Sequence, residues 1–283
     1  MIAERSGAKL NLSLDVTGRL PGGYHAVRSV MQGTDLWDEL ELEPGGEAWQ
    51  APSNLRYLPS GAQNLAVRAA VLFREETGLG PTGGVIRLKK NIPVCGGLGG
   101  GSGNAAAVLR AMNRLTGAGL SDGELRSLAE KLGSDVPFCV SGGTMLAEGR
   151  GEVLTPLPPL PDCGIVVCRP DFSSSTPELF AALDKSRLRV HPDTEGMIAA
   201  LSAGDLEGVA KRCFNVFETA LARRPAALVA ETKNTLLDLG ALGACMSGTG
   251  SAVFGLFLDR PAAAEAAAVL TDRGGVCFVC GPV

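Results

Sequence analysis

The residues with the clearest chemical potential lie in one glycine-rich stretch, residues 93–104, where six of the twelve residues are glycine. Glycine has no Cβ, so the backbone can turn tightly and a ligand can approach its N–H groups. Apolar residues at helical spacing follow from Ala105 to Leu115, and Gly117 ends this pattern. A helix start adds unpaired N–H donors and the positive end of the helix dipole. The stretch therefore predicts an anion site, most often a site for phosphate.

This stretch has two other interpretations. A flexible linker is the common one, but the stretch lies between a strand-like segment and a helix in a chain with no other low complexity. Residues 101–106 also match the loose dinucleotide pattern G-x-G-x-x-A, although Asp122 resembles a helix start and not the acidic end of a strand. The chain contains no Gly-Lys pair, which excludes a G-x-x-x-x-G-K-[ST] phosphate loop.

Two charged residues, Lys9 and Asp135, lie in segments whose patterns otherwise indicate ordinary secondary structure and turns. Residues 8–16 alternate as a half-buried strand, and Lys9 shares its polar face with Asn11 and Ser13. Asp135 follows the helix stop at Gly133 and precedes the apolar residues 136–140, which we expect to form a strand. The ordinary alternatives are a solvated lysine on a strand and a turn aspartate that bonds its own backbone.

An aromatic pair lies in the turn-rich segment 18–25, where Tyr24 and His25 follow two glycines. The ordinary interpretation is a hairpin turn that carries an aromatic lid. Placed beside a pocket, the same two side chains would supply flat apolar area and polar selection for a ring.

Composition and charge narrow the class of protein. The chain has 283 residues, of which 45% are hydrophobic and 20% charged, as in a globular protein of one large or two ordinary domains. A net charge of −4 argues against a nucleic-acid partner bound by bulk charge. No apolar run approaches the length of a membrane span, and polar residues interrupt any signal-peptide pattern at the N-terminus. We expect a cytoplasmic protein, a monomer or weak homodimer.

The eight cysteines are scattered singly, and only Cys277 and Cys280 have a C-x-x-C spacing. That pair has no second pair beside it, and the chain has two histidines in all. We interpret the cysteines as reduced, mostly buried thiols of a cytosolic protein and keep a zinc site as the alternative.

The elements that must position these residues follow from hydrophobic periodicity. Asn64 and Gly78 predict the ends of a helix, and Ser121 with Glu124 forms a capping box. Further helices are expected at 195–203, 205–222, 225–239 and 261–272, and strands at 85–92, 164–169, 252–258 and 276–280, with two short strands within 27–42. The proline-rich residues 155–161 suggest a boundary between residues 1–155 and 156–283. The pattern predicts an α+β class with two lobes.

The motifs together resemble those of the GHMP kinases, a superfamily that includes galactokinase, homoserine kinase and mevalonate kinase. The glycine-rich stretch resembles the second motif of these kinases, residues 8–12 the first and residues 247–250 the third. Residues 23–25, 63–65 and 133–138 resemble signatures of one branch, whose members phosphorylate the 2-hydroxyl of 4-diphosphocytidyl-2-C-methyl-D-erythritol on the methylerythritol phosphate route to isoprenoid precursors. These motifs occur in the family's order over almost the whole chain.

The resemblance implies a fold and a set of roles. The fold has an N-terminal lobe with a left-handed βαβ unit, which binds ATP, and a ferredoxin-like C-terminal lobe. Lys9 and Asp135 match the catalytic pair. The stretch matches the ATP phosphate loop, made of Pro93, Val94, Cys95, Gly96, Gly97, Leu98, Gly99, Gly100, Gly101, Ser102, Gly103 and Asn104.

Further roles are implied for residues outside the loop. Asn64 and Lys90 could lie near the nucleotide, and Ser102 could contact Mg²⁺. The pocket for a small cytidine diphosphate substrate matches six residues, with the tyrosine and phenylalanine around the cytosine ring and the histidine at its edge: Asn11, Tyr24, His25, Thr176, Pro177 and Phe180.

This chain departs from the family pattern at two loop positions. Cys95 stands where many relatives carry glycine, and we expect it to fit if its φ is negative. Gly103 stands where many carry serine, which removes a hydroxyl that could serve a phosphate. Two alternatives remain open: another GHMP small-molecule kinase, such as homoserine or mevalonate kinase, and a dinucleotide-binding or other non-catalytic nucleotide-binding protein.

Overall fold

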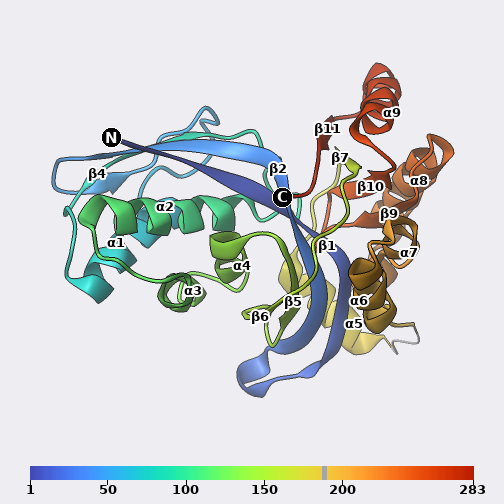
Figure 1. Ribbon diagram of the computed structural model, residues 1–283, viewed down its shortest axis with the longest axis horizontal. Helices are drawn as coiled ribbons and strands as arrows, with labels where there is room; N and C mark the ends of the chain where they lie inside the picture. The colour runs from blue at the N-terminus through green and yellow to red at the C-terminus, as the bar shows by residue number, and fades with distance from the viewer. Residues whose placement is uncertain (187–189) are drawn as a thin grey trace. The chain divides into compact units, whose positions relative to one another are not determined.

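Two long strands, β1 (Ile2–Arg19) and β2 (His25–Pro44), run through both of the units into which the computed structural model divides (Figure 1). The structure describes residues 1–186 and 190–283. Unit 1 consists of Met1–Lys9, Trp37–Val94 and Gly99–Gly142, and unit 2 of Leu10–Leu36, Cys95–Leu98 and Gly143–Val283. Each unit draws on both halves of the chain, so the boundary near residue 155 stays a prediction.

Unit 1 combines a sheet with four helices. Strand β4 (Gly84–Lys89) pairs antiparallel with β2, with Leu40 opposite Leu88, and parallel with the short β3 (Trp49–Gln50). The helices are α1 (Leu65–Thr77), α2 (Gly100–Thr116), α3 (Asp122–Glu130) and α4 (Val136–Ser141). Leu42 and Ile86 from the sheet share one buried cluster with Phe73 of α1 and Leu109 of α2. Figure 1 shows α2 lying along α1 in this unit.

The helix ends of unit 1 agree with the cap residues read from the sequence. Asn64 caps α1 by accepting a hydrogen bond from the Ala66 N–H, and Gly78 closes it in the left-handed conformation. Ser121 and Glu124 form the predicted capping box of α3. These local signals are confirmed because each works through residues that are neighbours in the chain.

Unit 2 contains a four-stranded antiparallel sheet in the order β11-β7-β10-β9. Its strands are β7 (Gly164–Cys168), β9 (Gly243–Met246), β10 (Val253–Phe257) and β11 (Cys277–Cys280). Helix α8 (Arg223–Asp238) precedes β9 and helix α9 (Arg260–Asp272) precedes β11. Two strand–helix–strand halves interleaved in this order form the predicted ferredoxin-like arrangement.

The remaining elements of unit 2 include two further strands that pair with the long ones. Strand β5 (Thr144–Glu148) pairs with β2 and with β6 (Val153–Pro156), and β8 (Phe214–Asn215) pairs parallel with β1. The helices are η1 (Pro21–Gly23), α5 (Thr176–Lys185), α6 (Thr194–Ala203), α7 (Leu206–Ala210) and η2 (Val216–Ala220).

Four expectations about the elements were wrong. Residues 27–42 lie in one continuous strand, and residues 136–140 form α4 instead of a strand. The predicted helix 205–222 is divided among α7, β8 and η2. Helix α2 begins at Gly100, inside the glycine-rich stretch, so Gly101, Ser102 and Gly103 belong to its first turn. Short apolar runs and small residues leave helix and strand open until tertiary contacts decide between them.

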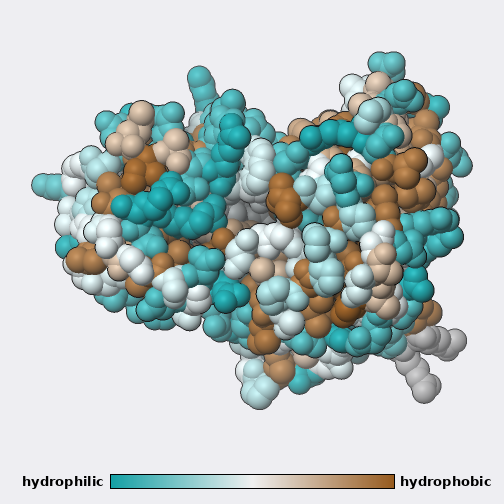
Figure 2. Space-filling model, in the orientation of Figure 1, coloured by the Kyte–Doolittle hydropathy of each residue, from teal (hydrophilic) through white to brown (hydrophobic). Residues whose placement is uncertain are grey.

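In the described part of the chain, no helix combines the length and apolar character that crossing a bilayer requires. The face shown in Figure 2 mixes hydrophilic and hydrophobic side chains over both ends of the view.

Candidate functional site

The Lys9 and Asp135 side chains meet in unit 1. Lys9 Nζ lies 3.4 Å from Asp135 Oδ2. The lysine side chain is 5% exposed and the aspartate side chain 42%, so the ammonium group is buried against a carboxylate that solvent can reach. Asp135 occupies the position before α4, yet its side chain makes no capping bond to that helix. The structure therefore lacks the capping bond that the alternative interpretation, a turn aspartate that bonds its own backbone, would favour.

Gly99 is the loop residue that makes room for Lys9. It lies before the first turn of α2 with φ +69°, a conformation that glycine adopts without strain. A Cβ placed on it would come within 2.8 Å of Lys9 Cγ. The glycine at this position thus allows the lysine side chain to pass along the start of α2.

The start of α2 lies within the stretch for which an anion site was predicted. The first backbone N–H groups of a helix have no acceptor inside it and carry the positive end of the dipole. In α2 these groups belong to Gly100, Gly101 and Ser102, while the Gly103 N–H already donates to the Gly99 carbonyl at 2.7 Å. Pro93 and Val94, the first two residues of the predicted loop, are partly buried in the same unit, and neither carries a charged group.

Gly103 and Ser102 differ in surroundings although both lie in the first turn. A Cβ on Gly103 would meet Ser6 Cβ at 3.2 Å and the Gly7 carbonyl at 3.3 Å. The helix therefore packs closely against β1 at Gly103, and a side chain there would require its neighbours to shift by a few tenths of an ångström. Ser102 is partly exposed and keeps the one hydroxyl of the turn.

Lys90 lies in a buried polar network of unit 1. Its Nζ donates to an Asp38 carboxylate oxygen and, at 2.7 Å, to Asn104 Oδ1. Asn104 Nδ2 in turn donates to the same Asp38 oxygen at 3.0 Å and to Ser6 Oγ at 2.9 Å. The other Asp38 oxygen accepts from the N–H groups of Asn91 and Ile92.

This network joins the loop before the glycine-rich stretch to the first turn of α2. The side chains of Lys90 and Asp38 are 4% and 0% exposed. A buried pair is tolerated only when its remaining polar atoms are also bonded, and here the backbone and Asn104 provide those bonds. The hydrogen bonds of Lys90 and Asn104 thus give them a positioning role, and direct nucleotide contact stays a prediction. Asn64 is likewise engaged as the cap of α1, and its Nδ2 donates to the Pro59 carbonyl.

Residues 95–98 of the loop belong to unit 2, where they contact the third motif. Gly97 has φ +76°, and a Cβ on it would lie 2.2 Å from the Ser247 carbonyl oxygen. Ser247 Oγ donates to the Gly97 carbonyl at 3.1 Å and accepts from the Asn11 N–H at 3.3 Å. The Gly96 carbonyl accepts from the Ala252 N–H at 3.0 Å, and Leu98 is buried. Backbone contact therefore fixes this part of the loop.

Cys95 does not meet the condition expected of it, because its φ is +58° instead of negative. It is an exposed residue in the left-handed region, where a side chain is disfavoured and glycine is not. A glycine at this position would adopt that backbone conformation without strain.

Of the predicted substrate residues, His25 and Phe180 lie together in unit 2. The His25 ring stacks on Phe180, with centroids 4.4 Å apart and planes 17° from parallel. His25 Nε2 lies 2.9 Å from Asp184 Oδ1, and Arg19 bonds the other oxygen of Asp184 at 2.8 Å. The hydrogen bond from His25, helped by Arg19, lowers the pKa of Asp184 below its ordinary value.

Tyr24 lies apart from that stack. Its ring is 55% exposed and faces the Arg150 guanidinium, whose carbon lies 5.2 Å from the ring centroid. The cytosine ring was expected to lie between Tyr24 and Phe180. That arrangement stays a prediction, because the His25 ring already covers one face of Phe180.

Asn11, Thr176 and Pro177 complete the predicted set. Asn11 Nδ2 donates to Ser29 Oγ at 2.8 Å. Thr176 begins α5 with Pro177 in its first turn, and Thr176 Oγ1 lies 3.0 Å from Thr249 Oγ1. Through these bonds α5 is linked to the third motif within the same unit.

Sequence reasoning missed Asp38, Asp184 and Arg150. Asp184 lies four residues after Phe180 on α5, so the two share a helix face, and that spacing was available as a signal. Asp38 and Arg150 gave no local signal, because their partners are distant in the chain.

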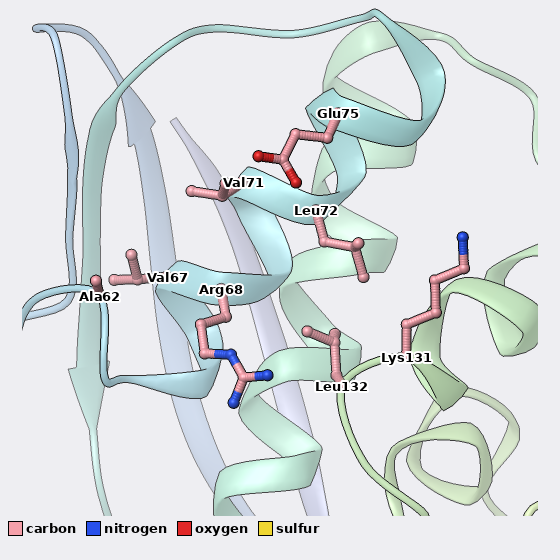
Figure 3. A pocket seen from close by; sticks show the side chains of 8 residues that line it. All are labelled: Ala62, Val67, Arg68, Val71, Leu72, Glu75, Lys131 and Leu132. Carbon is pink, nitrogen blue, oxygen red and sulfur yellow. The ribbon is translucent and has the colours of Figure 1, made fainter.

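The eight cysteines are free thiols, as expected. Among the described residues, no group of three or more His, Cys, Asp or Glu side chains could hold a metal ion. A cavity of about 280 Å³ lies over α1 in unit 1 (Figure 3), and the predicted site residues do not line it. Figure 3 shows Arg68 and Glu75 on α1, and Lys131, the residue that follows α3, also lines the cavity.

Comparison with known proteins places the chain in a family. Residues 64–143 match the family model of the GHMP kinases N-terminal domain, and residues 197–276 match the C-terminal one. A 4-diphosphocytidyl-2-C-methyl-D-erythritol kinase of Symbiobacterium thermophilum is 48% identical over 257 residues, covering 90% of each chain. One of Clostridium perfringens is 42% identical over 260 residues, covering 92% of this chain and 90% of that protein.

A solved structure agrees with these relatives. The crystal structure of a 4-(cytidine 5'-diphospho)-2C-methyl-D-erythritol kinase matches with a TM-score of 0.84 and 34% identity, covering 99% of both chains. The two-lobed α+β fold expected from the motifs is confirmed. The chain belongs to the GHMP kinases, a family of ATP-dependent small-molecule kinases, and within it to the branch of the 4-diphosphocytidyl-2-C-methyl-D-erythritol kinases.

Proposed function

We propose that this chain transfers the γ-phosphoryl group of ATP to the 2-hydroxyl of 4-diphosphocytidyl-2-C-methyl-D-erythritol. The observation that carries the proposal is the pairing of Lys9 Nζ with Asp135 Oδ2 at 3.4 Å in unit 1, which also contains the start of α2. Phosphoryl transfer requires held phosphates, neutralised charge and an activated hydroxyl, and these groups can supply all three. The relatives named for this activity support the choice of acceptor.

The proposed chemistry assigns one role to each group. Asp135 accepts the proton of the 2-hydroxyl as the oxygen attacks the γ-phosphorus. The buried ammonium of Lys9 holds the Asp135 carboxylate beside it and offsets the charge that develops on the transferred phosphoryl group. The N–H groups of Gly100, Gly101 and Ser102 bind phosphate oxygens of ATP.

Mg²⁺ is proposed as the metal cofactor. It binds mainly to phosphate oxygens and water, so it requires few protein ligands, and the single hydroxyl of Ser102 in the first turn of α2 fits that demand. Bound there, the ion would neutralise charge on the ATP phosphates.

Substrate selection is proposed to lie in unit 2. Tyr24, His25 and Phe180 would bind the cytosine, and Asn11, Thr176 and Pro177 the rest of the cytidine diphosphate group. The stacked His25 and Phe180 rings and the charged Asp184 behind them support a site for a flat, polar ring.

We also propose that residues 1–155 and 156–283 form the two functional domains, and that the protein is cytoplasmic, binds neither nucleic acid nor membranes, and is a monomer or weak homodimer. The net charge of −4 and the free thiols support this setting. Light scattering after size-exclusion chromatography measures the oligomeric state.

A coupled assay of ADP release tests the function. We expect turnover with ATP and the cytidine-containing acceptor, and none with 2-C-methyl-D-erythritol 4-phosphate, homoserine or mevalonate. Turnover with one of the last two would assign the chain to another GHMP kinase activity instead. Adding EDTA should abolish turnover without lowering the melting temperature, since the cysteine and histidine side chains hold no structural metal in the described residues.

A further inference from the structure

Cys277 and Cys280, which have the C-x-x-C spacing, are not paired with each other in the structure. Side chains three residues apart on a strand point to opposite faces of the sheet. Cys280 is fully buried, whereas Cys277 is partly exposed on β11. The Sγ atom of Cys277 instead lies 3.1 Å from Sγ of Cys168 on β7.

The backbone around Cys168 and Cys277 already has the geometry of a cross-link. The two residues are direct register partners of the antiparallel strands β7 and β11. The adjacent bond, in which the Arg169 N–H donates to the Val276 carbonyl at 3.0 Å, makes them a non-hydrogen-bonded pair. Cα atoms in such a pair are about 4.5 Å apart. Disulfides span Cα separations of about 4.4–6.8 Å, so a bond would require movement mainly of the sulfur atoms.

One thiol of the pair is also activated by the other. A hydrogen bond from Cys168 lowers the pKa of Cys277 below its ordinary value and raises that of Cys168. Burial, by contrast, raises the pKa values of Cys139, Cys163 and Cys213 to about 12. The thiolate is the nucleophile in thiol chemistry, which distinguishes Cys277 from these three buried thiols.

A cavity borders the pair at Cys168. It has a volume of about 290 Å³ and is lined by Cys168, Val276, Leu270 and Arg273, among others, all of unit 2. A peroxide is small enough for this space.

We propose that Cys168 and Cys277 are a redox-active pair that closes into a disulfide when the protein meets hydrogen peroxide. The Cys277 thiolate attacks one peroxide oxygen, which breaks the O–O bond, gives a sulfenic acid and releases hydroxide that takes up a proton. The Cys168 sulfur then attacks the Cys277 sulfur and displaces the oxygen as water, with loss of the Cys168 proton. In total two thiols are oxidised, one peroxide is reduced and two waters form. The bond ties the last strand to β7, which leads toward α5.

Mass spectrometry of the folded, full-length chain tests the proposal. The protein is treated with hydrogen peroxide, remaining thiols are blocked with N-ethylmaleimide, and a non-reducing digest is mapped. We expect one linked peptide pair that contains Cys168 and Cys277 and disappears after dithiothreitol. The same treatment in urea should give mixed pairings, because the register of β7 and β11 is then lost.

Two serine variants separate the pair from the C-x-x-C spacing. In Cys277→Ser the link should be absent and Cys168 should be recovered alkylated, whereas in Cys280→Ser the link should remain. Linkage of Cys277 to Cys280 in the folded wild-type chain would overturn the proposal. Oxidation of Cys277 to sulfinic acid while Cys168 stays alkylatable would also overturn it. Both results come from the wild-type protein, so they can be obtained even where a variant fails to fold.

Discussion

The imidazole of His25 and the ring of Phe180 lie face to face in unit 2, 4.4 Å apart at their centroids. Phe217 meets Phe180 edge-on at 4.9 Å. Phe180 is therefore held between two rings, and the face turned to His25 is covered. A base that stacks on Phe180 must contact another part of the ring or displace the imidazole of His25. We therefore expect His25 and Phe180 to act together in binding the base.

The first prediction concerns this stack. Phe180→Ala should raise KM for the cytidine-containing acceptor roughly 5- to 150-fold, the change in affinity that about 1–3 kcal/mol of base stacking corresponds to. The value of kcat should change much less, because the proposed role of the ring is to bind the base and not to take part in the transfer. Steady-state kinetics at saturating ATP measure both constants. Tyr57→Ala, which removes a 72% exposed ring in unit 1, is the control, and an unchanged KM in Phe180→Ala would refute the stacking role.

The second prediction is a pH dependence of stability through Asp184. Its pKa is lowered below 3.8 because His25 donates a hydrogen bond to it and Arg19 adds an ion pair. A carboxyl group with a lowered folded-state pKa stabilises the fold above its ordinary pKa, and this contribution is lost as the pH falls through the lowered value. The melting temperature of wild type should therefore exceed that of Asp184→Asn near pH 7, and the difference should shrink below about pH 4.

Thermal unfolding monitored by circular dichroism between about pH 7 and pH 3 measures this difference. Asp171→Asn, at an exposed position of the same unit, is the control. Its difference in melting temperature from wild type should not shrink as the pH falls. A gap between wild type and Asp184→Asn that widens on acidification would contradict the assigned sign.

The third prediction compares two adjacent carboxylates on β2. Asp38 is fully buried and pairs with Lys90, whereas Glu39 pairs at 3.2 Å with Lys89, where the two side chains are 45% and 64% exposed. Asp38→Ala leaves a buried charge without its partner and should cost about 3–5 kcal/mol. Glu39→Ala should cost at most about 1 kcal/mol. Urea unfolding of both variants gives the comparison, and equal costs would show that the buried network does not carry the stability assigned to it.

The sequence allowed prediction of those parts of the fold that depend on chain neighbours. Asn64, Gly78 and the pair Ser121 and Glu124 locate helix ends because each bonds the backbone within a few residues. Residues 136–140 were predicted as a strand because a short apolar run fits both types of element. Pro137 in the first turn of α4 was the local signal for a helix.

The site could be predicted in part for a similar reason. The motifs indicated Lys9 and Asp135, which the structure brings within 3.4 Å of each other. The buried network of Asp38, Lys90 and Asn104 joins three segments far apart in the chain, so no local pattern predicts it. The conformation of Cys95 at φ +58° is likewise set by the path of the whole loop and not by the residue itself.

The last prediction treats Lys9 and Asp135 as one unit. If Asp135 is the base and Lys9 holds its carboxylate in place, loss of either side chain removes the same function. Asp135→Asn should lower kcat by a factor of about 10²–10⁴, the usual contribution of a general base, and Lys9→Ala by a similar factor. The double variant should be little worse than the worse single variant, because residues that act together are non-additive.

Steady-state kinetics of wild type, the two single variants and the double variant test this non-additivity. Calorimetry measures substrate binding by the same four proteins. Binding should survive in Asp135→Asn, since asparagine keeps the shape of the side chain and loses only its charge. Lys131→Ala is the control, because Lys131 is a half-exposed lysine of unit 1 that pairs with Glu76 at 2.6 Å, and its kcat should stay at the wild-type value. If the losses in the double variant multiply in full, the 3.4 Å contact is not a functional coupling, and Lys9 would then serve the ATP phosphates independently of Asp135.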